Sequence, residues 1–335
     1  MSVRIKYSKW IWWAFAVIMV CVLPPLLKGY VVSIFIFVGI YSIVAIGLGL
    51  LLGWAGQISM GHGAFMGIGA YTSGVLSFRY GISPWLGIIC GMVITGSIAY
   101  AIGKAILHFR GHVLGVVTCA LGLIFYSLFG EMDFITGGYD GFSRIPRLSI
   151  GGFVFVKDIH FFYLLLVIFS ILFVVASNIA KSKIGNEFRT IDLHRGGSEV
   201  AAETLGINIG KIKTQAFVLS AVYASIGGSL YAHYVTHLDP TPFSLWTGFM
   251  MIIIVVIGGA RSLWGPVLGA AFYFGLKELI SVVIPTTQSA ALAGIEVILF
   301  SLFFILALLF SPDGLVQIPT VLRQFWVERT KRRGS

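Results

Sequence analysis

Apolar residues occur along this chain in long runs that short polar or charged segments separate. A helix that crosses the hydrocarbon core of a bilayer needs about 20 mostly apolar residues. The pattern therefore predicts an all-α polytopic integral membrane protein with about 8–10 transmembrane helices. The predicted spans cover residues 10–27, 30–52, 61–78, 85–107, 112–132, 160–179, 214–234, 245–260, 264–284 and 291–311.

The span count stays open between eight and ten because the segments 61–78 and 245–260 are short and the first is rich in glycine. We expect one transmembrane domain over residues 10–311, with a short N-terminal segment 1–9 and a polar C-terminal tail 312–335. No small-residue cleavage site follows the first apolar run, so residues 10–27 are expected to remain as a span. Polar loops are predicted at 133–159 and 180–213.

The apolar pattern is broken once by a run of small and polar residues, GWAGQISMGHGAFMGIGA at 53–70. Non-helical backbone at membrane depth is tolerated only where protein or a water-filled cavity covers it. One interpretation is a broken helix that lines a substrate pathway; the other is close helix packing with satisfied hydrogen bonds. The candidate pathway residues are Gln57, Ser59, Gly61, His62, Gly63 and Phe65.

Two pairs of glycines at the GxxxG spacing stand out, because this spacing lets helix backbones approach closely in lipid. They are Gly63 with Gly67 and Gly265 with Gly269, and each pair opens a predicted span. We assign Gly67, Gly265 and Gly269 to helix packing, although chance pairs are expected among 41 glycines.

Composition excludes a soluble globular protein, because 58% of the residues are hydrophobic and only 11% are charged, against roughly 25% charged in soluble domains. The net charge of +10 reflects basic residues near the ends of the spans and is no sign of nucleic-acid binding. With the N-terminus in the cytoplasm, 17 of the 23 Lys and Arg residues fall on the cytoplasmic side. The positive-inside rule thus favours two cytoplasmic termini and an even number of spans for this multi-pass membrane protein.

The chain contains no GxxxxGK[ST] segment that could bind the phosphates of ATP, and no GxSxG or HExxH motif. We therefore expect no enzymatic activity, no metal and no cofactor in this chain, and any ATP would be bound by another subunit. Segment 198–206, SEVAAETLG, is predicted to form a short amphipathic helix with Ser198 as its N-cap. It is either a docking element for a soluble partner or an ordinary charged connector.

Four blocks of the sequence together resemble the M-type (LivM) permease subunit of high-affinity branched-chain amino acid ATP-binding-cassette importers. They are GWAGQISMGHGAFMGIGAYTSGVL at 53–76, FITGGYDGF at 134–142, SEVAAETLGINIGKIKTQAFVLSAVYASIGGSLYAHY at 198–234 and VIGGARSLWGPVLGAA at 256–271. The resemblance implies a helical bundle of the vitamin B12 importer class. It also implies a homologous H-type permease in the same lipid bilayer, two cytoplasmic ATP-binding subunits and an extracytoplasmic substrate-binding protein as partners.

The resemblance also assigns the cytoplasmic coupling helix, which transmits the movement of the ATPases. Its residues are Ser198, Glu199, Ala201, Ala202, Glu203 and Gly206. The chain departs from the family where Gly185-Asn186 replaces the usual Gly-Arg and where residues 192–198 lengthen the link to this helix.

The expected substrate is a branched-chain amino acid (Leu, Ile or Val). Urea, a short amide or an aromatic acid in the same architecture is the first alternative. The second, of another class, is an ion-coupled secondary transporter or channel. Such a carrier usually needs an acid or histidine within its spans, and Glu296 is the main candidate here.

Overall fold

The computed structural model describes residues 29–106, 112–190 and 208–283, together with residues 202, 204, 206, 298, 301, 302, 305 and 314–317. The predicted span 10–27 and nearly all of the span 291–311, including Glu296, lie outside the described residues.

Long helices make up most of the described structure, and each coincides with one predicted span. They are α2 (Gly29–Ala55), α3 (His62–Tyr80), α4 (Pro84–Ile106), α5 (His112–Glu131), α7 (Asp158–Lys181), α10 (Ile209–Val235), α11 (Leu245–Gly258) and α12 (Gly265–Val283). The prediction of an all-α polytopic membrane protein is confirmed.

Short elements connect the long helices. The helical ones are α6 (Asp133–Thr136), α8 (Lys183–Thr190), η2 (Thr241–Phe243) and η3 (Leu315–Gln317). The strands are β1 (Phe142–Ser143), β2 (Ser149–Ile150), β3 (Phe153–Val154) and β4 (His237–Leu238). Strand β1 pairs antiparallel with β4, and β2 pairs antiparallel with β3.

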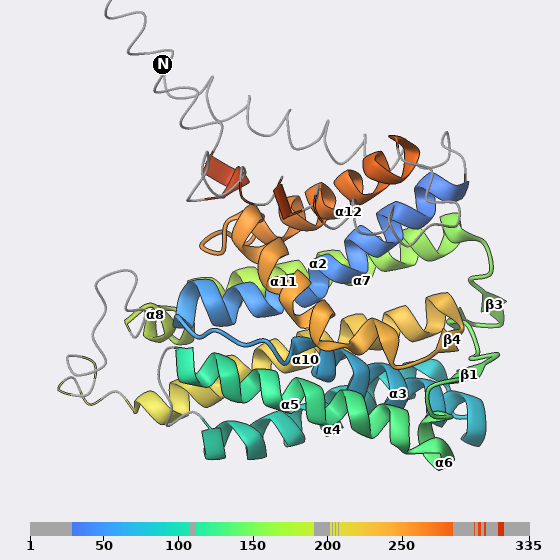
Figure 1. The fold of residues 1–335 in the computed structure, drawn as a ribbon, viewed down its shortest axis with the longest axis horizontal. Coiled ribbons are helices and arrows are strands. Elements are labelled where there is room, and N and C mark those ends of the chain that lie inside the picture. The colour runs from blue at the N-terminus through green and yellow to red at the C-terminus, as the bar shows by residue number, and fades with distance from the viewer. Residues whose placement is uncertain are drawn as a thin grey trace, which may run out of the picture.

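The long helices lie roughly along one direction, so the molecule has two ends (Figure 1). We call the end that carries α8 the α8 end and the opposite end, with α6 and the four strands, the strand end. Figure 1 shows α10 between α2 above it and α3 and α4 below it, and these are the helices that it contacts most extensively.

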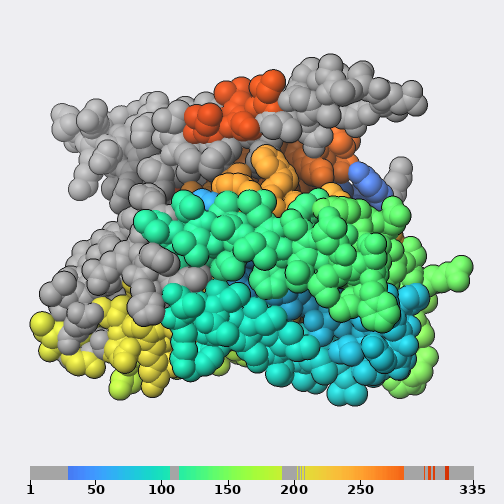
Figure 2. All heavy atoms as spheres, turned by 60° about the horizontal axis from the view of Figure 1, so that its bottom comes forward, coloured from blue at the N-terminus to red at the C-terminus, as the bar shows by residue number. Residues whose placement is uncertain are grey.

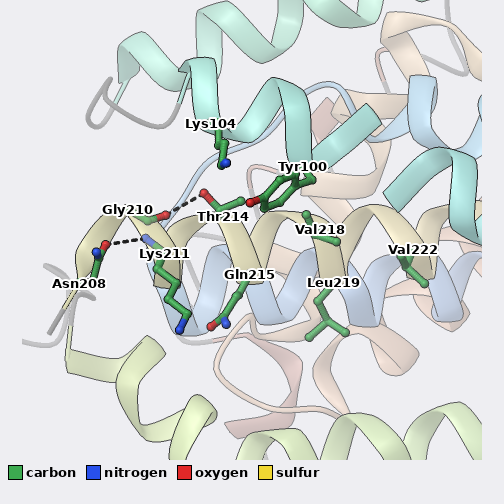
Figure 3. Close-up of a pocket in the computed structure, with 10 residues that line it drawn as sticks. All are labelled: Tyr100, Lys104, Asn208, Gly210, Lys211, Thr214, Gln215, Val218, Leu219 and Val222. Carbon is green, nitrogen blue, oxygen red and sulfur yellow. Dashed lines mark hydrogen bonds between the residues drawn. The ribbon is translucent and has the colours of Figure 1, made fainter. Parts of the chain in front are cut away.

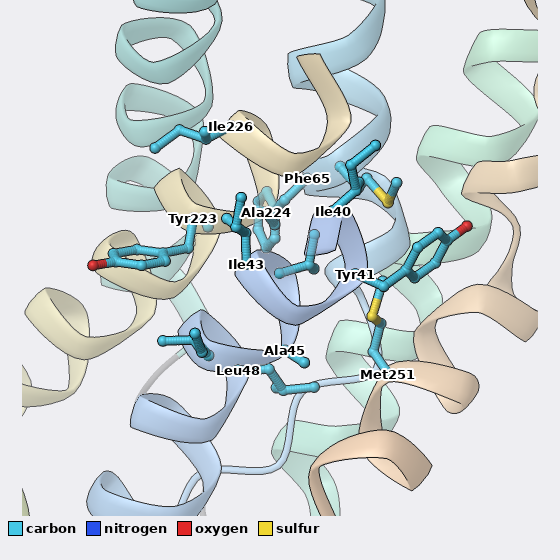
Figure 4. Close-up of a cluster of buried hydrophobic side chains, with 14 of the residues drawn as sticks. Ile40, Tyr41, Ile43, Ala45, Leu48, Phe65, Tyr223, Ala224, Ile226 and Met251 are labelled. Atoms are coloured by element: carbon cyan, nitrogen blue, oxygen red, sulfur yellow. The ribbon is translucent and has the colours of Figure 1, made fainter. Parts of the chain in front are cut away.

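The core is formed where α2, α3, α10 and α11 meet. Figure 4 shows Ile43 and Leu48 of α2 near Tyr223 of α10, Phe65 of α3 and Met251 of α11. Most of α3 is buried, including its serines and glycines. Low hydropathy in α3 is therefore explained by its place inside the bundle, where neighbouring helices and not lipid surround it.

Four of the described helices are long and apolar enough to cross a membrane by length and composition: α2, α4, α5 and α7, over Gly29–Ala55, Pro84–Ala105, Val113–Glu131 and Asp158–Lys181. Only α2 among them is mostly buried within the bundle. Helices α4 and α5 lie on the face shown in Figure 2 and expose aliphatic side chains such as Val93 and Val116. Such surfaces suit contact with lipid or with another membrane subunit.

Glycines allow the helices of the core to approach one another closely. A Cβ atom on Gly228 of α10 would overlap the Met66 carbonyl of α3, and one on Gly69 of α3 would lie 2.5 Å from Ser225 Cα of α10. The predicted packing glycines lie at similar places. Gly67 faces Phe129 and Phe243, whereas Gly265 and Gly269 of α12 face the backbone of Gly259 and Ile254.

The predicted loop at 180–213 contains two helical segments that the hydropathy pattern did not predict. Helix α8 occupies Lys183–Thr190, with Phe188 buried, and contacts α2, α7 and α10. Helix α10 begins at Ile209, five residues before the predicted start, because the Asn208 side chain caps it by accepting a 2.9 Å hydrogen bond from Lys211 N. Likewise, the predicted loop 133–159 contains α6 and three of the strands.

Candidate functional site

The polar run at 53–70 contains a true interruption between two helices. Helix α2 ends at Ala55, where Gly56 adopts φ +63° and Gln57 N donates to Leu51 O over 3.1 Å. A left-handed glycine directly after the last helical residue is a common helix end, and this hydrogen bond holds Gln57 back against α2. Residues 56–61 are non-helical, and α3 begins at His62.

Helix α3 begins inside the bundle. The His62 side chain contacts Ser220, which is the twelfth of the 27 residues of α10. At 1.5 Å per residue, Ser220 lies about 16 Å along a helix about 40 Å long. Segment 56–61 therefore turns back from the α8 end toward the middle of the bundle, as the pale blue trace in Figure 1 shows.

A second helix begins at the same depth. After α10 the chain forms β4 at the strand end and then returns through η2 to α11. A Cβ atom on Gly63 would lie 2.8 Å from Ser244 O, immediately before α11, and 3.1 Å from Phe243 O. The N-termini of α3 and α11 thus lie next to each other within the bundle.

Neither N-terminus has a side-chain cap, since Gly61 before α3 and Ser244 before α11 make no capping hydrogen bond. The first amide groups of an α-helix lack intrahelical acceptors, and the helix dipole adds partial positive charge there. Two such ends at one place create a region that favours a negatively charged group.

Small residues of α5 and α11 make room for the interruption. Met60 N donates to Thr118 Oγ1 over 3.1 Å, and a Cβ atom on Gly61 would lie 2.7 Å from Thr118 O. On the other side, a Cβ atom on Gly248 of α11 would overlap the Met60 carbonyl. The non-helical backbone is thus covered by protein, as membrane depth requires.

Three predicted pathway residues are fixed against α10. His62 is fully buried; its Nδ1 lies 3.1 Å from Ser59 Oγ, and its Nε2 is hydrogen-bonded to Ser220 Oγ. Phe65 packs edge-on against Phe217, with ring centroids 5.3 Å apart. These contacts agree with the packing interpretation for Ser59 and His62.

Gln57 differs from its neighbours. The side chain is 4% exposed, yet neither its amide oxygen nor its amide nitrogen has a hydrogen-bond partner. A buried polar group without a partner costs about 1–3 kcal/mol. Of the six predicted pathway residues, Gln57 therefore has the feature most typical of a group kept for binding.

Most of the predicted coupling helix, including Ser198, Glu199, Ala201 and Glu203, lies outside the described residues. Within it, Ala202 is helical and buried, and Gly206 has φ +76°.

Helix α8, which sequence reasoning missed, connects this loop to the interruption. Arg189 of α8 lies over the Trp54 ring at 4.4 Å, and its guanidinium also donates to Ala180 O over 3.3 Å. Trp54 is next to the last residue of α2, so α8 contacts the chain directly before the interruption begins.

A cavity of about 670 Å³ lies elsewhere, between α4 and α10. None of the predicted pathway residues lines it. Phe65 and His62 of α3 and Phe217 and Ser220 of α10 are all buried.

Intramembrane charge is scarce in the described part of the chain. Glu278 of α12 accepts a 2.7 Å hydrogen bond from Tyr30 of α2 in an exposed position, as expected for a headgroup-level position. No group of three or more His, Cys, Asp or Glu residues that could hold a metal occurs among the described residues. Sequence reasoning missed the residues of other segments that contact the interruption, because no local motif marks them. They are Thr118, Ser220, Ser244 and Gly248.

A bundle of apolar helices in which two helices begin at mid-depth, with irregular backbone covered by protein, is the construction of a membrane transport protein. Residues 30–311 match the sequence profile of the branched-chain amino acid transport system permease component family. The chain belongs to this family.

Individual relatives agree with this assignment. The chain is 29% identical over 265 residues to the high-affinity branched-chain amino acid permease protein LivM of Salmonella typhimurium, covering 72% of this chain and 61% of LivM. It is 26% identical over 301 residues to LivH of Escherichia coli K12, covering 84% and 92%. It is also 26% identical over 251 residues to the guanosine permease NupQ of Bacillus subtilis, covering 68% and 74%.

The chain thus spans about 61% of the length of the LivM relative. The matches to LivM support an M-type permease. No solved structure matches the chain.

Proposed function

We propose that this chain is a permease subunit of an ATP-binding-cassette importer and forms, with a homologous H-type permease, a pathway for branched-chain amino acids. Two ATP-binding subunits supply the energy, and an extracytoplasmic binding protein delivers the substrate. The chain itself carries out no catalysis, and both of its termini lie in the cytoplasm. Family membership over residues 30–311 and the absence of an ATP-binding motif support this assignment.

The single observation that carries the proposal is the meeting of two uncapped helix N-termini beside Gly63. A branched-chain amino acid is a zwitterion with a small apolar side chain. Helix N-termini stabilise its carboxylate without a fixed positive charge, which would hold the substrate too tightly for transport. The Gln57 amide, which has no partner, supplies further polar contact when the pathway opens.

The described conformation corresponds to a closed pathway. Opening requires movement around the interruption, and α8 is placed to transmit it, because Arg189 contacts Trp54 at the end of α2. Closure of the ATPases would move the coupling helix near 198–206 and, with it, α8. The coupling then has to shift the equilibrium between the closed and the open packing of the bundle by a few kcal/mol. This is an ordinary magnitude for two-state switches.

Replacing Gln57 by Met separates a binding role from a packing role. Met keeps the length of the side chain but removes the unpartnered amide, so the free energy of unfolding should stay equal or rise, by up to about 1–3 kcal/mol. ATP-driven uptake of leucine into proteoliposomes that hold the complete importer should fall severalfold. The matched control is Thr95→Val in α4. It removes a buried hydroxyl that, like the Gln57 amide, has no partner, and it should leave uptake unchanged. Equal uptake by both variants would exclude Gln57 from the pathway.

Replacing Glu199 by Lys tests the coupling assignment. Charge reversal in the docking helix should reduce ATP-driven uptake at least tenfold while ATP hydrolysis and membrane insertion persist, because the movement no longer reaches the permease. The control is Glu131→Lys, an exposed residue at the C-terminus of α5. Normal uptake by Glu199→Lys would contradict the coupling role.

The function itself is tested by uptake of radiolabelled leucine into proteoliposomes that hold this chain with its partner permease, both ATPases and the binding protein. ATP-dependent accumulation that disappears when this chain is omitted is the expected result. ATP hydrolysis without leucine uptake would retain the architecture and reject the cargo, and guanosine, urea, short amides and aromatic acids would be tested next. Leucine movement by this chain alone, without ATP, would indicate an ion-coupled carrier or channel instead.

A further inference from the structure

The cavity of about 670 Å³ is lined by the last turns of α4 and the first half of α10. These parts of the two helices point toward the α8 end of the bundle (Figure 1). Figure 3 shows Lys104 and Tyr100 on the α4 side, and Lys211, Val218 and Val222 along α10. The side chains of Lys104 and Lys211 are both exposed. None of the described residues that line the cavity is an Asp or Glu, so the cavity carries net positive charge.

Polarity changes along the length of the cavity. Lys211, near the start of α10, lines its polar end, and Val218, Leu219 and Val222 line its apolar end. Val222 lies eleven positions after Lys211 in the helix, which corresponds to about 16 Å. That distance is comparable to one leaflet of a hydrocarbon core about 30 Å thick.

The α4 side has the same division. The Lys104 Nζ atom lies 4.6 Å from the centre of the Tyr100 ring, one helical turn deeper. Gly96, a further turn along, packs against Val222, with an ideal Cβ atom 3.4 Å from Val222 Cγ2. A basic residue followed by an aromatic one is typical of the boundary between headgroups and hydrocarbon.

We propose that this cavity binds one anionic glycerophospholipid. Its phosphate binds at the polar end beside Lys104 and Lys211. Figure 3 shows the Lys211 side chain directed away from Lys104, so its flexible stem has to turn for both ammonium groups to reach one anion. An acyl chain lies along Val218, Leu219 and Val222. Basic pockets between membrane helices bind acidic headgroups in this manner.

The depth of the apolar part argues for a lipid rather than a soluble subunit. A cytoplasmic protein could contact Lys211, but it would have to pass about 16 Å into the hydrocarbon to cover Val222. A lipid fills both parts at once. Because α10 also contacts α2 and α3, a bound lipid would stabilise the position of α10 against α4.

Native mass spectrometry of the full-length chain in its complex with the partner subunits tests the proposal, with phosphatidylglycerol as the probe and phosphatidylethanolamine as the zwitterionic comparison. Each lysine near an anionic headgroup contributes on the order of a fivefold gain in affinity. The double variant Lys104→Gln/Lys211→Gln should therefore bind phosphatidylglycerol at least tenfold more weakly. The double variant Lys104→Arg/Lys211→Arg should bind it as the unmodified chain does.

The matched control is Lys181→Gln, an exposed lysine at the same end of the bundle that does not line the cavity. It should leave binding unchanged. Equal binding by Lys104→Gln/Lys211→Gln and the unmodified chain would overturn the proposal, as would equal affinity for phosphatidylethanolamine. Displacement of the lipid by millimolar inorganic phosphate would indicate a free-anion site. Loss of a partner subunit from the double Gln variant would indicate a protein-docking face, and both outcomes also reject the lipid site.

Discussion

Gly269→Val should prevent correct packing of α12 and strongly reduce the yield of folded protein. A Cβ atom at this position would overlap the Ile254 carbonyl and lie 3.1 Å from Gly258 N, both in α11. Backbone atoms cannot rotate away as a side chain can, so the helices must separate. Overpacking of a core costs about 1–3 kcal/mol, and the cost here should reach the top of that range or exceed it. Thermal unfolding in detergent and the monodisperse fraction after extraction measure the effect.

Gly275→Val is the matched control because it makes the same change six residues further along α12. Gly275 is exposed, and a Cβ atom there would have no neighbour within 4 Å. We expect stability equal to that of the unmodified chain, since Val is no poorer a helix former than Gly. Comparable loss in both variants would show that helix α12 tolerates no side chain and that the contact with α11 is not the cause.

His62→Leu should destabilise the protein by about 2–5 kcal/mol, because it leaves the Ser59 and Ser220 hydroxyls without partners in a fully buried place and each costs about 1–3 kcal/mol. The imidazole now hydrogen-bonds both of them and connects α3 to α10 where α3 begins. A fall in melting temperature measured on the purified chain is the expected readout.

The triple variant Ser59→Ala/His62→Leu/Ser220→Ala distinguishes lost hydrogen bonding from lost shape. Replacing every partner with apolar groups removes the unpaired hydroxyls, so most of the stability should return. A triple variant as unstable as His62→Leu would mean that the imidazole acts through its shape. Uptake adds a separate test: a stable triple variant that no longer transports would place this polar group in the pathway.

The packing glycines show how far sequence patterns reach. GxxxG spacing selects Gly265 and Gly269, which do face the backbone of α11, but it misses Gly228 and Gly248. With 41 glycines in the chain, spacing alone does not distinguish Gly248, which admits the Met60 carbonyl, from Gly275, which faces open space. The difference depends on whether the backbone of another segment lies against the glycine, and that is a property of the assembled bundle.

Helix α8 illustrates a different limit. Lys183–Thr190 is too short and too polar to appear in a hydropathy pattern, and isolated helices of this length are unstable in water. It forms because Phe188 is buried and Arg189 packs over Trp54. The contact of Arg189 with Trp54 joins residues that are far apart in the chain. Phe188 becomes buried only once the bundle has folded.

By itself, the sequence determined that this is a membrane protein of many helices, where most of those helices lie, and that a small and polar run at residues 53–70 breaks the regular pattern. Hydrophobic length and the requirement to satisfy backbone groups in lipid are local properties, so they can be read along the chain. Only the tertiary structure decided that α11 begins beside α3, that Ser220 and Thr118 satisfy the polar groups of the interruption, and that Gln57 is left without a partner. These facts depend on contacts between helices distant in sequence, and the free energy of such contacts exists only once the bundle has formed.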